Sequence, residues 1–384
     1  ADAWTPIQWR ARNEAGTWST WANYSAASPV YTGWVLSEGD GEKSVCVQYK
    51  DGGGTTSTEV CDTIKLDTIS PNCPFTIELD CTPPAEDPLY TPSRNVCLHF
   101  DYSDGPFMVA YGNYPGPTNW AAITGNTEQR SWELTNVDGL KTVYARCKKL
   151  SGLTSADFTD TITLDTLPPS QPGKPVPVAT PTNDNTPTWT WTDAVDSGSG
   201  LADSVRYRVQ WWKDGTTPGV DDNIEFVNTN SFTGTTAFSS DGVWHIKVWA
   251  FDKVGNRSEA SLPGDVLIDT QAPQNCTLYI NDINMIGVNT TNVWLVNTGC
   301  SEPIYQVGYK NESAPANADV NIAYSTTYYG WTLQNLDGVR TVYAKFKDYA
   351  GNITTAFSDT IILDRVAPSK PGAPQCTTPT NDTT

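Results

Sequence analysis

The sequence predicts an all-β chain, built as a tandem array of antiparallel β-sandwich domains of about 100 residues each. Short runs rich in Val, Ile, Thr, Tyr and Trp alternate with Gly, Pro, Asn and Asp, which is the pattern of strands and turns. An Asp-Gly turn followed by an alternating strand recurs four times, with gaps of 98, 103 and 96 residues. The copies begin at Asp40, Asp138, Asp241 and Asp337.

An apolar strand end, an aspartate and then a proline close each repeat. The four phrases are "LDTISP", "LDTLPP", "IDTQAP" and "LDRVAP", the first of which begins at Leu66. Proline cannot donate a hydrogen bond to a sheet, so each phrase marks the place where a strand stops and a linker begins.

The repeats are of two alternating kinds. Much of the passage from Tyr144 to Gly173 recurs from Tyr343 to Gly372, 199 positions later. Two repeats open with "PNC" or "PQNC", and two open with "PSQPG" or "PSKPG". The repeating unit of the sequence is therefore a pair of domains.

The repeat spacing predicts five segments, which cover residues 1–68, 69–167, 168–270, 271–366 and 367–384. We expect the first to be a partial domain without its first two strands, and the last to be the first strand of a further domain. One interpretation is a window cut from a longer array. The other is strand donation, in which the tail of one chain completes the head of another. The stretch "PTWTWTDAVDSGSGL" has no counterpart at either end, which argues against complete donation.

The composition narrows the possible partners. A hydrophobic content of 38% is enough for packed cores. The net charge of −19 argues against binding to nucleic acid, because phosphate contacts need Lys and Arg. No stretch approaches the run of about 18 apolar residues that indicates a membrane-spanning helix.

Nine cysteines indicate disulfides in an oxidising, extracellular or cell-surface location. None of them forms a Cys-x-x-Cys motif and no histidines cluster near them, which argues against zinc. Cys46 and Cys61 flank a predicted hairpin, and Cys97 and Cys147 are placed on inward-facing positions of an early and a late strand. The predicted pairs are Cys46–Cys61, Cys97–Cys147, Cys276–Cys300 and, as the remaining two, Cys73–Cys81, with Cys376 left unpaired or paired to another chain.

The repeated phrases carry a family resemblance. The succession of the Asp-Gly turn, "TVYA", an "AGN" hairpin and the "LD…P" linker resembles the bacterial Ig-like repeats of long cell-surface and secreted proteins, which are related in shape to fibronectin type III domains. The second domain departs from this pattern, with "LSG" in place of "AGN". The resemblance implies an array of Ig-like domains in a stalk, adhesin, surface layer, filament or spacer of a secreted enzyme.

No motif predicts an enzyme. The only two histidines, His99 and His245, lie in different domains, and we expect no catalytic group to converge on either. Neither a Gly-x-Ser-x-Gly nor a His-Glu-x-x-His motif is present. The prediction is a non-enzymatic chain without a catalytic site or an organic cofactor.

Calcium is the one cofactor that the sequence raises. Asp193, Asp196 and Asp203 crowd a short loop, and carboxylate oxygens are ligands that calcium prefers. The alternative is a solvated turn between strands. The linker aspartates Asp67, Asp165, Asp269 and Asp364 can likewise hold a cation between domains, or accept hydrogen bonds at strand ends.

Tryptophan is abundant, with 15 residues. Trp34, Trp132 and Trp331 recur before three of the four Asp-Gly turns and are predicted to lie in the cores. Others are denser than a core requires, so they are candidates for stacking on sugars, for a protein interface or for packing. These are Trp4, Trp9, Trp18, Trp21, Trp211 and Trp212.

Seven Asn-x-Ser/Thr sequons are candidate glycosylation sites. They are Asn23, Asn256, Asn275, Asn289, Asn311, Asn352 and Asn381. Together the sequence predicts a structural component of an extracellular filament, stalk or surface layer, whose partners are copies of itself or neighbouring repeats. The alternatives are an adhesin or carbohydrate-binding array that takes a glycan or another surface ligand, and the spacer of a secreted hydrolase.

Overall fold

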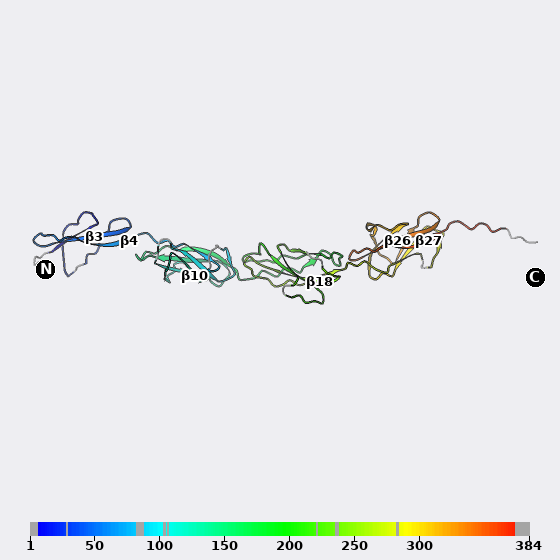
Figure 1. Ribbon diagram of the computed structural model, residues 1–384, viewed down its shortest axis with the longest axis horizontal. Helices are drawn as coiled ribbons and strands as arrows, with labels where there is room; N and C mark the ends of the chain where they lie inside the picture. Colours follow the sequence, from blue (N-terminus) through cyan, green and yellow to red (C-terminus); the bar gives the residue numbers. More distant parts are fainter. Residues whose placement is uncertain are drawn as a thin grey trace, which may run out of the picture. The chain divides into compact units, whose positions relative to one another are not determined.

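The computed structural model describes residues 7–372, apart from 28–29, 82–87, 103–104, 106, 220–221, 235–237 and 282–283. These residues form seven β-sheets, and their one helical element is the short 3-10 turn η1 (Asn317–Asp319), so the all-β prediction is confirmed (Figure 1). The chain divides into two compact parts, Ala1–Leu167 and Pro168–Thr384, which are described separately. Among the described residues no helix is long and apolar enough to cross a membrane.

The first domain contains one antiparallel sheet in the order β2-β1-β3-β4. Its strands are β1 (Gln8–Asn13), β2 (Ala22–Asn23), β3 (Gly41–Lys50) and β4 (Val60–Leu66). No second sheet faces it among the residues described here.

The second domain is a sandwich of a three-stranded sheet, β10-β7-β5, and a five-stranded sheet, β6-β12-β11-β8-β9. Its strands are β5 (Phe75–Glu78), β6 (Tyr90–Thr91), β7 (Asn95–Asp101), β8 (Met108–Gly112), β9 (Ala121–Ala122), β10 (Thr127–Glu133), β11 (Gly139–Lys148) and β12 (Phe158–Leu164). The pairs are antiparallel except that β6 runs parallel to β12.

The third domain packs β13-β14-β17 against β16-β15-β18-β19. Its strands are β13 (Val176–Pro177), β14 (Thr188–Thr190), β15 (Tyr207–Lys213), β16 (Ile224–Val227), β17 (Ser231–Thr233), β18 (Gly242–Ala250) and β19 (Gly264–Ile268). Thr182 forms a parallel bridge to Ile268 at the end of β19.

The fourth domain repeats the design of the second, with sheets β20-β22-β25 and β21-β27-β26-β23-β24. Its strands are β20 (Thr277–Ile280), β21 (Gly287–Val288), β22 (Asn292–Thr298), β23 (Ile304–Asn311), β24 (Ile322–Ala323), β25 (Thr327–Thr332), β26 (Gly338–Asp348) and β27 (Phe357–Leu363). Here β21 runs parallel to β27.

The strand after each Asp-Gly turn supplies core residues by simple alternation. In β26, Val342, Ala344 and Phe346 are fully buried, whereas the residues between them are only partly buried. Side chains two positions apart on a strand point to the same face, so one face of the strand builds the core. The second, third and fourth domains each have one such core cluster.

The matching face of the first domain is open. Ile64 of β4 is 58% exposed, whereas its counterparts Ile162 in β12 and Ile361 in β27 are each 1% exposed. Val60 of β4 is also exposed, at 68%. The first domain therefore presents, on its single sheet, side chains that form core in the second and fourth domains.

Four disulfides are formed, two of them as predicted. Cys46 pairs with Cys61 across β3 and β4, and Cys276 pairs with Cys300. The predicted pairs Cys97–Cys147 and Cys73–Cys81 are wrong. Instead Cys73 pairs with Cys147 and Cys81 pairs with Cys97. Cys376 lies outside the described residues.

The error in the second domain is a register error on β7. Val96, Leu98 and Phe100 belong to the core cluster, so Cys97 points to the opposite face of the strand. Cys97 is nevertheless fully buried, and it pairs there with Cys81. Cys73, which precedes β5, lies in the core and reaches Cys147 on the facing sheet.

Candidate functional site

The Asp-Gly turn of every repeat holds the linker that follows the domain. Asp40 accepts hydrogen bonds from the backbone N–H and the hydroxyl of Thr68, at 2.9 and 2.6 Å. The Thr68 hydroxyl bond holds the pKa of Asp40 below its usual range. The same clamp joins Asp138 to Thr166 and Asp241 to Thr270, and an ion pair of 2.6 Å joins Asp337 to Arg365. The aspartate of each Asp-Gly turn thus holds the start of the linker against the end of its own domain.

The linker aspartates also bond to the linker itself. The carboxylates of Asp165, Asp269 and Asp364 each accept the backbone N–H two residues further on, at 3.4, 3.1 and 3.0 Å. Asp67 instead receives the ammonium group of Lys149, at 3.1 Å. Three of the four linker aspartates thus accept hydrogen bonds at strand ends, and a cation site at the linkers remains a prediction.

A lysine ammonium group closes the junction between the first and second domains. The Lys149 Nζ lies 3.1 Å from the Asp67 carboxylate and 2.9 Å from the carbonyl oxygen of Ile69. The sequence around Lys149, "YARCKK", aligns with "YAKFKD" in the fourth domain, where the position is Asp348. A cation in one repeat is therefore replaced by an anion in the other.

Three carboxylates meet at the junction between the third and fourth domains. Oxygens of Asp269, Glu302 and Asp348 all lie within 4.8 Å of one another. Asp348 is 2% exposed and accepts hydrogen bonds from the backbone N–H groups of Gly351 and Asn352, at 2.7 and 2.9 Å. Loss of water contact, together with the charges of Asp269 and Asp348, raises the pKa of Glu302.

Asn352 ties this cluster to the linker. Its side-chain amide donates to the carbonyl oxygens of Asp269 and Gln271, at 2.8 and 3.0 Å, and to Asp348 at 2.9 Å. Across the same junction, the backbone N–H of Asn183 donates to the carbonyl oxygen of Ala350. The carboxylates are thus held in place by a fixed backbone, and together with nearby carbonyls they supply the hard oxygen ligands that calcium prefers.

The three aspartates predicted as calcium ligands are occupied by separate contacts. Asp193 accepts the Tyr207 hydroxyl at 2.6 Å, and burial together with this bond raises the Tyr207 pKa to about 12. Asp196 accepts the backbone N–H groups of Gly198 and Gly200, at 3.1 and 2.6 Å. Asp203 is 3.8 Å from Lys253. The sequence did not indicate Glu302 and Asp348 as calcium ligands, because "SEP" and "KDY" lack the residue spacing of a calcium-binding loop.

A tryptophan and an asparagine form the same clip in three domains. The indole N–H of Trp132 donates to the Asn113 side-chain oxygen at 2.9 Å, and the Asn113 amide donates to the Glu133 carbonyl at 3.0 Å. Identical bonds join Trp34 to Asn13 and Trp331 to Asn311. In the second domain the clip fastens the loop after β8 to β10 of the other sheet. The sequence contained its signal in an asparagine about 20 residues before each of these three tryptophans.

We expect replacement of Asn113 by alanine to destabilise the second domain by about 1–2 kcal/mol, because a half-buried indole N–H and a backbone carbonyl then lose their partners. Urea unfolding followed by tryptophan fluorescence measures the change. Asn119→Ala in the same loop is the matched control, since the exposed Asn119 amide has no partner among the described residues and its loss is expected to cost almost nothing. Equal effects of the two variants would contradict the clip.

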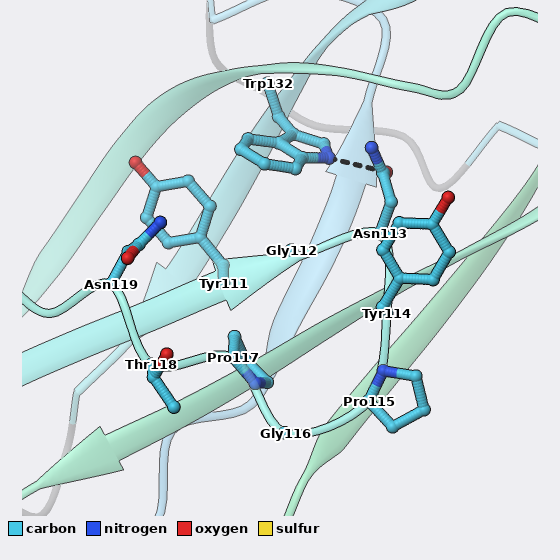
Figure 2. A pocket seen from close by; sticks show the side chains of 10 residues that line it. All are labelled: Tyr111, Gly112, Asn113, Tyr114, Pro115, Gly116, Pro117, Thr118, Asn119 and Trp132. Carbon is cyan, nitrogen blue, oxygen red and sulfur yellow. Dashed lines mark hydrogen bonds between the residues drawn. The ribbon is translucent and has the colours of Figure 1, made fainter.

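A hollow of about 360 Å³ opens beside this clip in the second domain. Figure 2 shows Tyr111, Trp132 and Pro117 around it, with Asn119 on one side and Tyr114 on the other. The rings of Tyr111 and Trp132 meet edge to face at 5.3 Å, and Tyr111 contacts the core through Phe100. None of its lining side chains is charged.

The dense tryptophans of the first domain stack on cations. The Arg10 guanidinium lies 4.6 Å from the ring centres of both Trp18 and Trp21, and Arg12 lies 4.9 Å from Trp18. The Lys50 ammonium group covers Trp21 at 4.5 Å. The faces of the Trp18 and Trp21 rings are therefore covered by cations of the same domain. Trp4 lies outside the described residues.

The two tryptophans predicted as surface candidates in the third domain also have partners. Trp211 stacks on Phe232 at 5.2 Å beside the core cluster. Trp212 packs against His245 at 5.4 Å and lies 5.6 Å from the Lys247 ammonium group. Packing, the third of the alternatives for these residues, accounts for both.

Two carboxylates flank His245, which the sequence alone did not indicate. Its Nδ1 lies 2.7 Å from Asp265 and its Nε2 lies 3.3 Å from Asp214. Because carboxylates engage both ring nitrogens, neither nitrogen is placed to take a proton from a hydroxyl or thiol, as nucleophilic catalysis requires. His99 lies 3.6 Å from the buried Glu78.

The predicted glycosylation sites differ in whether the asparagine side-chain amide already donates hydrogen bonds within the protein. The side-chain amides of Asn256, Asn311 and Asn352 donate hydrogen bonds within the protein. Asn23, Asn275 and Asn289 are exposed. Asn381 lies outside the described residues. The three exposed sequons remain predictions, and the first three need rearrangement before they can accept a glycan.

Comparison with known proteins places the chain in no family. No family model and no curated protein matches it. Among solved structures, the FN1–FN3 domains of chicken CNTN1 align with 76% of this chain and 100% of their own, at 13% identity and a TM-score of 0.32. At that TM-score the alignment adds nothing to what the chain's own sheets show, namely tandem β-sandwich domains.

Proposed function

We propose that the chain is a structural, non-enzymatic repeat region of an extracellular filament, stalk or surface layer. The observation that carries the proposal is the use of the repeated residues. Asp40, Asp138, Asp241 and Asp337 each bind the linker at the end of their own domain rather than converging on a shared site. Four disulfides support an oxidising location, in which such an array keeps its covalent links.

The proposed assembly step is strand addition at the edge of β4. In the second and fourth domains, a short parallel strand borders the last strand, and in the third domain Thr182 does so. There the Thr182 N–H donates to the Leu267 carbonyl at 3.0 Å, and the Asp269 N–H donates to the Thr182 carbonyl. No such neighbour borders β4 among the described residues.

The tail of the chain carries the sequence that this edge would accept. "TPTND" occurs at Thr180, where it borders β19, and again at Thr378. We propose that the tail of one copy pairs with β4 of the next. Such a head-to-tail contact does not close on itself, so it produces a fibre rather than a ring.

A synthetic peptide of residues 368–384 tests the step. We expect it to bind the whole chain, as measured by fluorescence anisotropy, and to inhibit self-association in sedimentation velocity. The control peptide carries Thr380→Pro, which removes the N–H that corresponds to that of Thr182 and is expected to weaken binding at least tenfold. If the chain stayed monomeric at high concentration and bound neither peptide, the result would refute strand addition.

We also propose that Asp269, Glu302 and Asp348 hold a calcium ion that stiffens the junction of the third and fourth domains. Two observations support it. Burial of Glu302, together with the charges of Asp269 and Asp348, raises its pKa, so the cluster holds uncompensated negative charge. At the corresponding place in the first junction, the chain itself supplies a cation, because Lys149 replaces Asp348 and binds Asp67. Calcium is the expected ion because the ligands are oxygens.

A further inference from the structure

The hollow beside Tyr114 in the second domain has the chemistry of a saccharide site. We propose that it binds a neutral oligosaccharide, independently of whether the chain forms a filament. Its volume, about 360 Å³, lies in the range of small-molecule sites, which is about 300–1,000 Å³. Tyr114, at its rim, is 73% exposed although it belongs to a loop that is otherwise firmly held.

The loop that shapes the hollow is fixed before any ligand arrives. The clip from Trp132 to Asn113 holds its start, and the Gly116 N–H donates to the Asp157 carboxylate at 2.9 Å to hold its tip. Pro115 and Pro117 restrict the backbone on both sides of Gly116. A loop that is already ordered loses little conformational entropy when it binds, which favours affinity.

The free groups of the hollow match the two sides of a sugar ring. The Tyr114 ring offers an aromatic face for the apolar C–H face of a pyranose. The exposed Asn119 amide and Thr118 hydroxyl have no partner among the described residues, and each offers both a donor and an acceptor, as sugar hydroxyls require. This hollow differs from a purely apolar groove because it contains polar groups that both donate and accept hydrogen bonds.

The charge of the hollow selects the class of saccharide. The chain carries a net charge of −19, yet no lining side chain is charged, so nothing there neutralises an acidic sugar. A proline-rich peptide is the other ligand that aromatic grooves bind. The Trp132 indole N–H, the natural donor to a peptide carbonyl, is already used by Asn113, which favours the sugar.

The corresponding places in the other clipped domains lack this combination. The residue after the clip asparagine is Glu14 in the first domain and Glu312 in the fourth, where the second domain has Tyr114. In the first domain the neighbouring Trp18 is also covered by Arg10 and Arg12. The proposed site is therefore specific to the second domain.

Saturation-transfer NMR on the whole chain tests the proposal, with neutral hexasaccharides of glucose (α- and β-1,4), mannose, xylose and N-acetylglucosamine as probes. We expect transfer to at least one of them and none to an oligogalacturonate of equal length. Tyr114→Ala and Asn119→Ala should each weaken the bound hexasaccharide about three- to tenfold. Both residues are exposed, so thermal unfolding of the variants should stay unchanged.

Tyr329→Ala is the matched control, because Tyr329 in β25 is 76% exposed and belongs to another domain. It should leave binding unaltered. Absence of transfer to every hexasaccharide, equal loss in the Tyr114 and Tyr329 variants, preference for the oligogalacturonate, or displacement of the sugar by a decaproline peptide would each overturn the proposal.

Discussion

Replacing both Cys73 and Cys147 by alanine is expected to lower the free energy of unfolding of the second domain by about 4 kcal/mol. The bond joins the two sheets and closes 74 residues of sequence, so without it the unfolded chain regains much freedom. For a domain of this size the melting temperature should fall by roughly 15–30 °C. Differential scanning calorimetry of the whole chain measures this change as the shift of one transition.

The double variant of Cys46 and Cys61 is the control. Its loop spans 15 residues, for which the same relation gives about 3 kcal/mol, and its effect should fall on the first domain alone. If the Cys73 and Cys147 variant shifted all transitions equally, or shifted none of them, the result would contradict a bond that stabilises the second domain by joining its two sheets.

Calcium chloride at 10 mM is expected to stabilise the junction of the third and fourth domains by about 1.4–2.7 kcal/mol, if the affinity is that of extracellular calcium modules, about 0.1–1 mM. The ion would replace carboxylate repulsion by attraction among Asp269, Glu302 and Asp348. The transition of the fourth domain should move up in calorimetry and return after addition of EDTA. Magnesium at the same concentration should act less, because it gives up its water ligands reluctantly.

Glu302→Gln separates ion binding from general salt effects. The folded protein raises the Glu302 pKa, so the charged form is disfavoured by folding and stability falls as the pH rises through the carboxylate range. Without calcium, the glutamine variant should therefore be more stable than the parent at pH 7 and equal to it near pH 4. It should also lose its response to calcium. A calcium shift that survives this substitution would place the ion elsewhere.

The sequence contained the β-sandwich repeat but not the contacts between distant strands. The alternating pattern after the Asp-Gly turn agrees with the buried face of β26, because the turn fixes where that strand begins. On β7 no such marker exists, and an error of one position reversed the face assigned to Cys97. The pairing of Cys73 with Cys147 then depended on a residue that precedes its strand, for which no periodicity applies.

The candidate sites were harder to predict for a related reason. Lys149 and Asp348 occupy one position of the repeat, so their alignment was visible, but their partners Asp67 and Asp269 come from the other side of a junction. The dense tryptophans suggested sugar stacking, a protein interface or packing, and in the first domain arginines cover the rings of Trp18 and Trp21. Only the folded chain places Tyr114 and Asn119 beside a tryptophan from a separate sheet.

The bond between Cys73 and Cys147 also sets how far the protein can stretch under load. An unfolded residue spans about 3.5 Å at most, so forced opening of the third domain, which has no cysteine, releases about 350 Å of extended chain. In the second domain the bond holds 74 residues together, and only about 90 Å of extended chain is released. The second domain is therefore less extensible than the third and the fourth, because the fourth domain's bond closes only 24 residues. Reduction of the Cys73–Cys147 bond would release the 74 residues behind it.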